Sequence, residues 1–462
     1  MTKDALIAWT FLTALCAAGP ALALEPTVTT SPPATAGAFD AGAAKARIDA
    51  LLDRDYPGLE AVYKDIHAHP ELAFQETRSA ALLARKMRQA GFDVTERVGK
   101  TGLVAIYRNG PGPTVLVRTE LDALPMEEKT GLPYASHAQQ MWNGALTPVD
   151  HSCGHDAHMT WWLGTAQALV AMKDVWSGTL VFIAQPAEET VSGAQAMIDD
   201  GLFTRFPKPD YAFAAHTAPM PLGTVIIKDG TVTAAADSLD IVFHGRGGHA
   251  SAPQLTIDPI AMGAHFVSDV QTVASREKDP AAFGVITVGS FQAGTVGNII
   301  PDEARLRLSL RSMSPEVRTL LLTGIRRTAQ AESDMAGAPQ PTITHTEGTN
   351  SVHNDGALIQ RVLPAMKSTF GGGLVYIPAT MTGFSASEDF SEITTAGVPS
   401  VYYWVGGSDP KVLAAYKARG ELPPANHSPY FAPVPEPTIR TGVEVLTLSV
   451  LAVSRPAAPQ PR

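Results

Sequence analysis

Cysteine is nearly absent from this chain of 462 residues, in which only Cys16 and Cys153 occur. Cys16 lies in an N-terminal apolar stretch with the pattern of a cleaved export signal, so the mature protein would carry a single thiol. A framework of internal disulfides is therefore excluded, although an oxidising compartment usually favours them. Cys153 is left free for another task.

Basic runs and long apolar segments are missing as well. The formal net charge is −10 and no Lys/Arg-rich run stands out, which argues against nucleic acid and anionic membrane surfaces as partners. The apolar run from Leu6 to Ala18 is shorter than a bilayer-spanning helix requires. Because Lys3 precedes it and Ala21-Leu22-Ala23 follows it, the run predicts a signal peptide over residues 1–23. We therefore expect a secreted or periplasmic protein without stable membrane insertion; an uncleaved N-terminal anchor is the alternative.

Apolar residues are plentiful within the rest of the chain. They make up 45% of the sequence against 17% charged residues, which is typical of a globular protein with a sizeable core in two or three domains. Residues 24–45 are rich in Ala, Thr and Pro and predict a flexible leader. Residues 46–230 and 347–462 alternate short apolar runs with helical stretches. This pattern predicts an α/β domain with a mostly parallel mixed sheet flanked by helices.

The second block, residues 231–346, has a different pattern. Ser238–Phe243 alternates as a half-buried strand, and from Arg305 to Arg311 leucines occupy one face while Arg and Ser occupy the other. Helices are expected near 258–276 and 315–335, and the remaining strands near 285–291 and 342–346. The order strand-helix-strand-strand-helix-strand predicts an inserted two-layer α+β domain.

The richest cluster of reactive residues surrounds Cys153. The segment 150–158 reads Asp-His-Ser-Cys-Gly-His-Asp-Ala-His, a combination of thiol, carboxylates and imidazoles that packing hardly explains. Cys153 and His155 are two positions apart, so both can face one side of an extended or irregular segment, and thiolate and imidazole are preferred zinc ligands. The segment predicts a metal site. His151 and His158 stay open between ligand and structural roles.

Further candidate ligands follow predicted strands. Glu188 and Glu189 come directly after the apolar run 180–184, where α/β proteins place their ligands. Adjacent side chains diverge, so one carboxylate could bind metal while the other acts as a general base; a solvated loop is the alternative. His216 ends the run 211–215, and His427 precedes the last helix. Both are ligand candidates only because a partial metal set already exists.

Four other residues could orient a metal ligand or bind the substrate. Asp122 follows a predicted strand and could orient a ligand histidine or simply cap a turn. His249 lies in a glycine-rich turn that lacks the Walker pattern, so phosphate binding is discounted. Asn298 and Arg311 could bind a substrate carboxylate, Arg through its planar donor fork, and a structural role is equally open for each.

Eight stretches of the chain, taken together, resemble one family. They are His67–Leu72, Leu121–Pro125, Cys153–His158, Pro186–Glu189, Gly247–Ala250, Asn298–Pro301, Ser387–Phe390 and His427–Pro429. In this order, from about residue 48 to the C-terminus, they resemble the amidohydrolase branch of the dinuclear metallopeptidases, which includes aminoacylase and glutamate carboxypeptidase. Within that branch the chain is similar to hippurate hydrolase and the auxin-amino-acid-conjugate hydrolases.

The resemblance implies a catalytic domain with an inserted lid that also mediates formation of a homo-oligomer. It implies two divalent metal ions per subunit, zinc or alternatively manganese. The implied ligands are Cys153, His155, Glu189, His216 and His427.

The resemblance also implies the reaction. Glu188 would be the general base, and His249 would polarise the scissile carbonyl. Asn298 and Arg311 would hold the carboxylate of the substrate. The expected substrate is a small N-acyl amino acid, with an aromatic acyl group, whose amide bond is hydrolysed.

One departure and two alternatives stay open. The strand before Asp122 ends Arg118-Thr119-Glu120 where the family has Arg-Ala-Asp, so the longer Glu120 puts the geometry of the metal site in question. A dipeptidase or carboxypeptidase could use the same centre, and activity on free-amine dipeptides would favour it. A metal-dependent binding protein is the other alternative, against which the Glu188-Glu189 pair argues because a binder needs no base.

Overall fold

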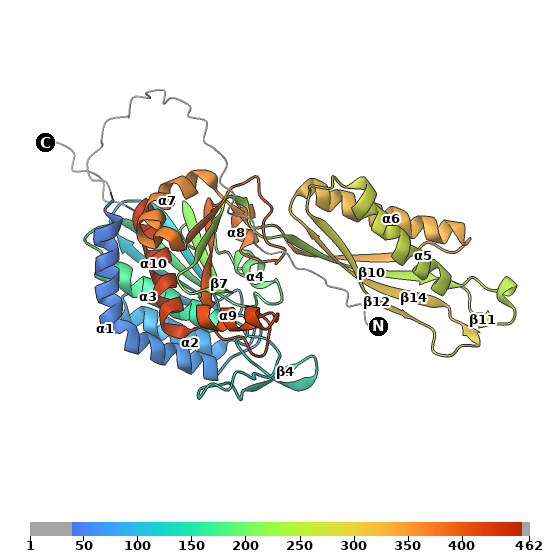
Figure 1. Ribbon diagram of the computed structural model, residues 1–462, viewed down its shortest axis with the longest axis horizontal. Helices are drawn as coiled ribbons and strands as arrows, with labels where there is room; N and C mark the ends of the chain where they lie inside the picture. Colours follow the sequence, from blue (N-terminus) through green and yellow to red (C-terminus); the bar gives the residue numbers. More distant parts are fainter. Residues whose placement is uncertain (1–38, 455–462) are drawn as a thin grey trace, which may run out of the picture. The chain divides into compact units, whose positions relative to one another are not determined.

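An eight-stranded mixed sheet forms the first of two layered parts in the computed structural model, which describes residues 39–454 (Figure 1). Its strands lie in the order β1-β2-β6-β3-β7-β18-β8-β17. Their bounds are Asp93–Val98 (β1), Gly102–Asn109 (β2), Thr114–Glu120 (β3), Gly178–Gln185 (β6), Tyr211–Pro221 (β7), Val225–Lys228 (β8), Leu374–Ile377 (β17) and Ser400–Ser408 (β18). The central strands β6, β3, β7 and β18 run parallel, and β2 and β8 pair antiparallel to them. The predicted mixed sheet is confirmed.

Helices cover both faces of this sheet. In β2, Leu103 and Ala105 belong to the core on one face, and Val104 and Ile106 to the core on the other. The first face is covered by α1 (Ala41–Ala68), α2 (Thr77–Gln89), α3 (His155–Ala171), α7 (Gly356–Phe370) and α10 (Pro435–Val453). The second is covered by α4 (Gly193–Asp199) and α8 (Ser391–Thr395). Strands buried on both faces read as continuous apolar runs, which is why the sequence revealed them.

The carboxyl ends of the parallel strands meet at one edge. Glu120 at the end of β3 is in register with Gln185 at the end of β6, and in the neighbouring pair His216 of β7 is in register with Trp404 of β18. The segments that follow these strands therefore lie close together, as ligand-binding segments do in α/β sheets.

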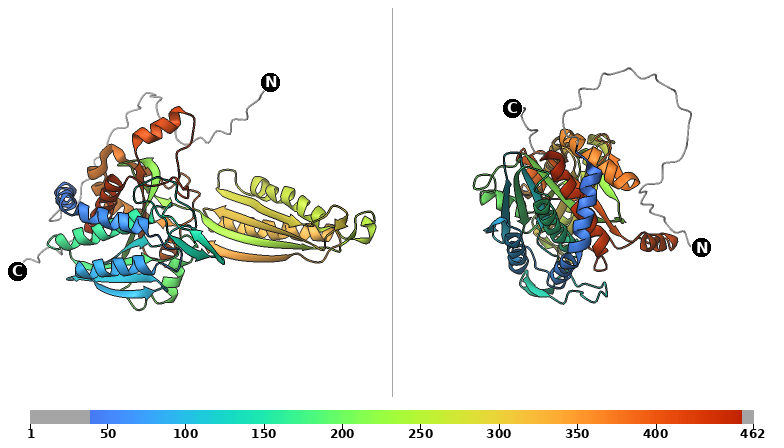
Figure 2. Two further views of the ribbon diagram at one scale, coloured as in Figure 1. Left: turned by 90° about the horizontal axis from the view of Figure 1, so that it is seen from below. Right: turned by 90° about the vertical axis from the view of Figure 1, so that its left-hand side faces the viewer.

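A four-stranded antiparallel sheet in the order β12-β14-β10-β15 forms the second part. Its elements are β10 (Ala235–His244), α5 (Pro259–Thr272), β12 (Gly284–Ala293), β14 (Glu303–Ser312), α6 (Pro315–Met335) and β15 (Thr342–Thr349). Leu306, Leu308 and Leu310 point from β14 into a core shared with α5 and α6, which cover one face (Figure 2). Leucine alternates with Arg and Ser in this part of the sequence because the leucines face this core. The inserted two-layer α+β domain is confirmed. We call this part, residues 235–349, the lid domain; the sequence pattern placed its ends at 231 and 346.

Short elements complete the chain. They are β4 (Gln139–Trp142), β5 (Ala145–Pro148), β9 (Gly230–Thr231), β11 (Gly248–His249), β13 (Ile299–Ile300), β16 (His353–Asn354) and α9 (Pro410–Ala418), with 3₁₀ or π turns at Pro253–Leu255, Val273–Glu277 and Gly371–Gly373. β4 and β5 form a hairpin around Asn143 and Gly144, both with positive φ.

Helix α1 begins inside the stretch expected to be a flexible leader. Asp40 accepts a hydrogen bond from the backbone N–H of Ala43 at 2.9 Å, and Ala41 and Ala44 are buried. The expected leader is therefore wrong for residues 41–45, because an alanine-rich stretch behind an aspartate cap is a strong helix start. The signal peptide expected over residues 1–23 lies outside the described residues. Within residues 39–454, no helix is both long and apolar enough to cross a membrane.

Candidate metal centre and active site

Cys153 and His155 flank Gly154, where α3 begins. Gly154 has φ +92°, and a Cβ atom there would lie 2.4 Å from Cγ2 of Thr217, so glycine allows a close approach to β7 that other residues would block. This approach brings Sγ of Cys153 to 3.3 Å from Nε2 of His216. Both side chains are buried.

Backbone carbonyls orient the two buried histidines. Nδ1 of His216 lies 2.6 Å from the carbonyl oxygen of Thr217, and Nδ1 of His155 lies 2.8 Å from that of Asp122. A histidine that donates from Nδ1 keeps its Nε2 lone pair available for a metal. Nε2 of His155 is buried and has no hydrogen-bond partner among the described residues. It is therefore directed at a site that a ligand can fill.

His427 reaches the same place from far along the chain. Its Nε2 lies 3.3 Å from Oε2 of Glu189. Its backbone N–H donates to the carbonyl of Ser152 at 2.9 Å, and Asn426 donates from Nδ2 to the carbonyls of Cys153 and Thr217. His427 has φ +67°, a strained value for a residue other than glycine that persists only where the surroundings impose it.

The five predicted ligands meet in two overlapping groups. Cys153 joins His155 and His216 in one group and Glu189 and His427 in the other, with the ligand atoms of each group within 4.8 Å of one another. The prediction that the Cys153 and His155 pair, the end of β6, the end of β7 and the loop before α10 converge therefore agrees with the structure.

The centre has an excess of buried acidic side chains. Its buried acids are Glu76, Glu120, Asp122, Glu188, Glu388 and Asp389, with the partly buried Glu189 beside them, and the buried guanidinium of Arg118 contacts three of the buried acids. Burial and the neighbouring carboxylates raise the pKa of Glu188 well above its ordinary value, and burial raises that of Glu189 to about 7. Burial alone would lower the pKa of His155, but the Asp122 carboxyl group and the other surrounding acids raise it to about 10, so a bound cation would take the place of the proton on Nε2. Such a site favours cations, and its sulfur, nitrogen and oxygen donors fit a zinc-like metal.

The carboxylate of Asp122 accepts hydrogen bonds from the backbone of both Glu188 and Glu189. The backbone N–H of Glu188 donates to Oδ1 of Asp122 at 3.0 Å, and that of Glu189 donates to Oδ2 at 2.9 Å. Asp122 was expected either to cap a turn or to orient a ligand histidine. That task falls to its carbonyl oxygen, 2.8 Å from Nδ1 of His155, whereas the nearer carboxylate oxygen is 3.6 Å away. The carboxylate instead accepts the two hydrogen bonds from the segment that carries Glu188 and Glu189.

The two histidines left open by the sequence differ in their contacts, and His158 forms a further possible ligand group with Glu120 and His155. His158 uses both ring nitrogens: Nδ1 lies 3.1 Å from Oε2 of Glu120, and Nε2 accepts from the backbone N–H of Thr217 at 2.9 Å. The longer Glu120 thus bridges Arg118 on β3 and His158 on α3. His151 belongs to none of the ligand groups among the described residues, and burial lowers its pKa to about 4, so it is neutral.

The three lid-domain candidates do not form one site within a chain. β11 and β13 place His249 beside Ile299, and the N–H of Ala250 donates to the carbonyl of Asn298 at 3.1 Å. Arg311 lies near the opposite end of β14, eight residues or roughly 26 Å beyond Glu303 at about 3.3 Å per residue. Its guanidinium donates to Ser309 and to the carbonyl of Leu310. Asn298 and Arg311 of one chain therefore cannot hold the same carboxylate.

Several buried residues of the centre received no role from the sequence. Arg118 donates to Glu388 at 2.7 Å and to Asp389 at 3.0 Å, and Tyr402 donates to Glu388 at 2.9 Å. Two features of the sequence could have pointed to these residues. One is the charge of Arg118 inside an otherwise apolar strand, and the other is the stretch Ser387–Phe390, which resembles the family. Glu76 had no signal of its own, because its partners Thr101 and Ala187 are far away in the sequence.

A buried ion-pair triad anchors the start of α3. Nδ1 of His67 lies 2.6 Å from Asp156, and Nε2 lies 3.1 Å from Glu128. Burial alone would lower the pKa of His67, but the two acids outweigh it and raise the pKa to about 10. The charged triad ties α1 to α3 directly next to the Cys153 and His155 pair.

The triad predicts a pH-dependent stability. A histidine whose pKa rises from 6.5 unfolded to about 10 folded stabilises the protein fully below pH 6.5 and progressively less up to pH 10. At pH 6, His67→Gln should lower the free energy of unfolding by about 3–5 kcal/mol, because it leaves two buried acids unpaired. Urea unfolding of both proteins at pH 6 and pH 9.5 should show this gap shrinking. The exposed His265→Gln control should show no gap, and a gap that widens with pH would contradict the assignment.

An α/β fold that brings sulfur, imidazole and carboxylate donors together beside a buried glutamate is typical of metal-dependent hydrolases. The profile of Peptidase family M20/M25/M40 matches residues 116–451. The chain belongs to this family and is an amide-bond hydrolase.

Curated relatives agree with this assignment. The chain is 40% identical to the hippurate hydrolase of Campylobacter jejuni subsp. jejuni over 265 residues, which cover 56% of this chain and 66% of that enzyme, just under two thirds. It is 33% identical to the N-acetylcysteine deacetylase of Bacillus subtilis over 74% of this chain and 86% of the relative. It is 32% identical to thermostable carboxypeptidase 1 of Saccharolobus solfataricus over 85% and 94%.

Solved structures share the fold. The Bacillus subtilis YXEP protein, described as a dinuclear metal binding peptidase from the M20 family, matches with a TM-score of 0.70 and 27% identity over 88% of this chain and 99% of that chain. A protein from methicillin resistant Staphylococcus aureus matches with a TM-score of 0.78 and 28% identity over 89% and 100%.

Proposed function

We propose that this protein hydrolyses the amide bond of N-acyl amino acids with an aromatic acyl group, releasing a carboxylic acid and a free amino acid. The observation that carries the proposal is the convergence of five ligand candidates beside the buried Glu188. Similarity to a hippurate hydrolase and an N-acetylcysteine deacetylase supports an N-acyl amino acid as the substrate. Hippurate is itself the amide of an aromatic acid, which favours aromatic acyl groups.

We propose further that two divalent cations bind here, zinc or alternatively manganese. Cys153, His155 and His216 would hold one cation, and Cys153, Glu189 and His427 the other. The excess of buried acids and the description of the YXEP neighbour as dinuclear support this number. Bound cations would polarise the amide carbonyl and lower the pKa of a water molecule.

Glu188 is proposed to move the proton. Its carboxylate lies 3.8 Å from Nε2 of His155, at the edge of the ligand set, where a carboxylate can accept a proton and return it. Glu188 would take a proton from the attacking water as the oxygen–carbon bond forms. It would give that proton to the amide nitrogen as the carbon–nitrogen bond breaks.

The lid-domain residues are proposed to handle the substrate. His249 would donate to the carbonyl oxygen that becomes negative, and its neighbour Asn298 would hold the substrate carboxylate. Arg311 is the alternative carboxylate ligand, at a different place in the lid. Formation of a homo-oligomer through the lid and export to the periplasm or medium remain proposals that rest on the family resemblance and on residues 1–23.

A carboxypeptidase that uses the same centre is the second candidate. It is favoured by the similarity to thermostable carboxypeptidase 1, which extends over 94% of that relative. Both candidates need the same metals and the same base, so only the substrate separates them.

A substrate panel tests the proposal. The protein should release glycine from hippurate faster than from N-acetylglycine, and much faster than from unblocked dipeptides. Treatment with a chelator should abolish release, and zinc or manganese should restore it while metal analysis shows two ions per subunit. Faster cleavage of unblocked dipeptides or of longer peptides would favour the peptidase instead. Full activity without bound metal would refute the proposal.

A further inference from the structure

The loop that carries Glu188 and Glu189 has a strained backbone. It joins β6 to α4, and Ala187 and Val191 both adopt left-handed conformations, with φ +50° and +51°. Such conformations are rare for residues other than glycine and persist only where the surroundings impose them. At the end of the loop, a Cβ atom on Gly193 would lie 1.5 Å from the carbonyl oxygen of Pro186, so the loop closes tightly on itself.

Buried carboxylates from distant segments accept hydrogen bonds from backbone amides of this loop and of the first turn of α4. Glu76 accepts from the N–H of Ala187 at 2.8 Å, and Asp389 accepts from the N–H of Ala194 at 2.9 Å. Asp122 holds the two amides between them, as described above. Hydrogen bonds to buried carboxylates therefore hold the loop at its start, at Glu188 and Glu189, and at the helix turn that follows it.

Glu76 occupies an unusual place for this task. It is the residue before α2, where a side chain normally caps the helix, yet it makes no capping hydrogen bond. Glu71 caps the helix instead, accepting from the N–H of Arg78 at 2.9 Å and of Ser79 at 2.7 Å. Glu76 is fully buried, and it accepts from Phe74, Ala187 and the Thr101 hydroxyl.

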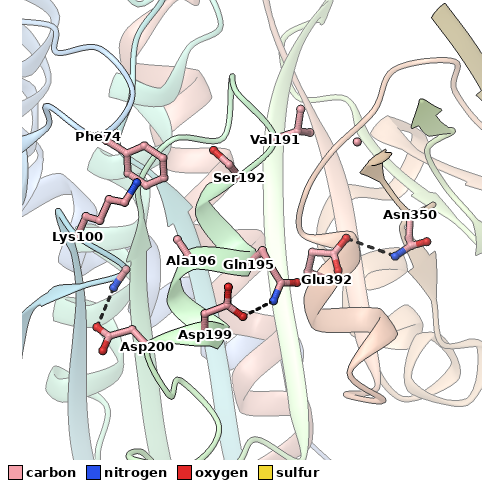
Figure 3. Close-up of a pocket in the computed structure, with 12 residues that line it drawn as sticks. Phe74, Lys100, Val191, Ser192, Gln195, Ala196, Asp199, Asp200, Asn350 and Glu392 are labelled. Carbon is pink, nitrogen blue, oxygen red and sulfur yellow. Dashed lines mark hydrogen bonds between the residues drawn. The ribbon is translucent and has the colours of Figure 1, made fainter. Parts of the chain in front are cut away.

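Packing does not hold the outer side of the loop. Val191 and Ser192 line a cavity of about 940 Å³, into which Phe74 and Lys100 also project (Figure 3). No candidate metal ligand lines this cavity. With open volume on its outer side, the strained loop is held by its own backbone hydrogen bonds and by the carboxylate contacts on its inner side.

We propose that Glu76 is a positioning residue for the active site, acting through the backbone of Ala187 to set the direction of Glu188 and Glu189. The inference rests on the proposed function, because it assumes that Glu188 transfers the proton and that Glu189 binds metal. A shift of the reacting group by about 1 Å can cost roughly 100-fold in rate. Removing a partner that only orients a metal ligand costs about 10- to 100-fold in affinity or activity.

Four variants test the role of Glu76, with kcat, KM, zinc affinity and Tm measured for each. Glu76→Ala should lower kcat and zinc affinity by about 10- to 100-fold with little change in KM. Glu76→Gln should stay within a few fold of the parent, because the amide oxygen still accepts from Ala187. Thr101→Val, which removes a hydroxyl donor to Glu76, should fall between them. Glu71→Ala is the matched control: it removes a buried carboxylate that holds two backbone amides of α2, and should lower Tm without lowering kcat.

Each outcome decides the inference. Equal kcat and zinc affinity in Glu76→Ala and Glu71→Ala would overturn it, and so would a Glu76→Gln variant as damaged as Glu76→Ala. If Glu76→Ala does not fold, unchanged kcat and zinc affinity in Thr101→Val would overturn it, and a loss at unchanged Tm would support it. A parent protein inactive on every amide would refute the proposed function, whereas zinc affinity would still report whether Glu76 positions Glu189.

Discussion

Replacing Glu188 with glutamine is expected to lower kcat by about 100- to 10,000-fold, the range that general acid–base catalysis contributes. Glutamine has the same shape, and its backbone N–H can still donate to Asp122, so the loop should stay in place. An amide cannot accept and return a proton at the carboxylate's position. Turnover of hippurate should fall while metal analysis still finds the parent's metal content.

The metal content of the Glu188→Gln variant shows whether Glu188 acts as a base or as a metal ligand. If Glu188→Gln lost metal together with activity, Glu188 would be a metal ligand, and the assignment of Glu189 as the ligand would need revision. Undiminished kcat would remove Glu188 from the mechanism altogether. Glu436→Gln, an exposed glutamate in the first turn of α10, is the matched control and should behave like the parent protein.

The sequence predicted the strands of the central sheet because both of their faces are buried. Runs such as Leu180–Ala184 are apolar throughout, and a reactive residue directly after such a run stands out. For the same reason the order of residues alone could assign the Glu188-Glu189 pair and His216 to one edge of the sheet. The hairpin β4–β5 was missed, although Asn143-Gly144 is a recognised turn signal.

The contacts behind the site could not be predicted. Whether Asp122 orients His155 through its carbonyl or its carboxylate depends on a difference between 2.8 Å and 3.6 Å, which no pattern encodes. Asn298 and Arg311 looked equivalent as carboxylate ligands, and only the strand register separates them. Glu76 reaches a loop 111 residues later in the chain. Such pairings depend on the packing of the whole domain.

Removing the thiol should be nearly as damaging as removing the base. Sγ of Cys153 belongs to both ligand groups, and a thiolate is a strong, charged donor for zinc. Cys153→Ala is expected to lose at least one metal ion per subunit and to lower kcat/KM by more than about 100-fold, since loss of a partner that merely orients a ligand costs up to that much. Metal analysis and hippurate turnover measure the two effects.

The Tm of the Cys153→Ala variant tests the same assignment independently. Cations that bind the folded protein stabilise it, so a chelator should lower the Tm of the parent protein. With a ligand missing, Cys153→Ala should start from a lower Tm and respond less to the chelator. Ser152→Ala is the matched control, because Ser152 is equally buried next in the chain and its hydroxyl contacts Met126 rather than the ligand set. A Cys153→Ala protein with two bound metals, parent activity and the parent's response to the chelator would show that the convergence of these side chains does not form the metal site.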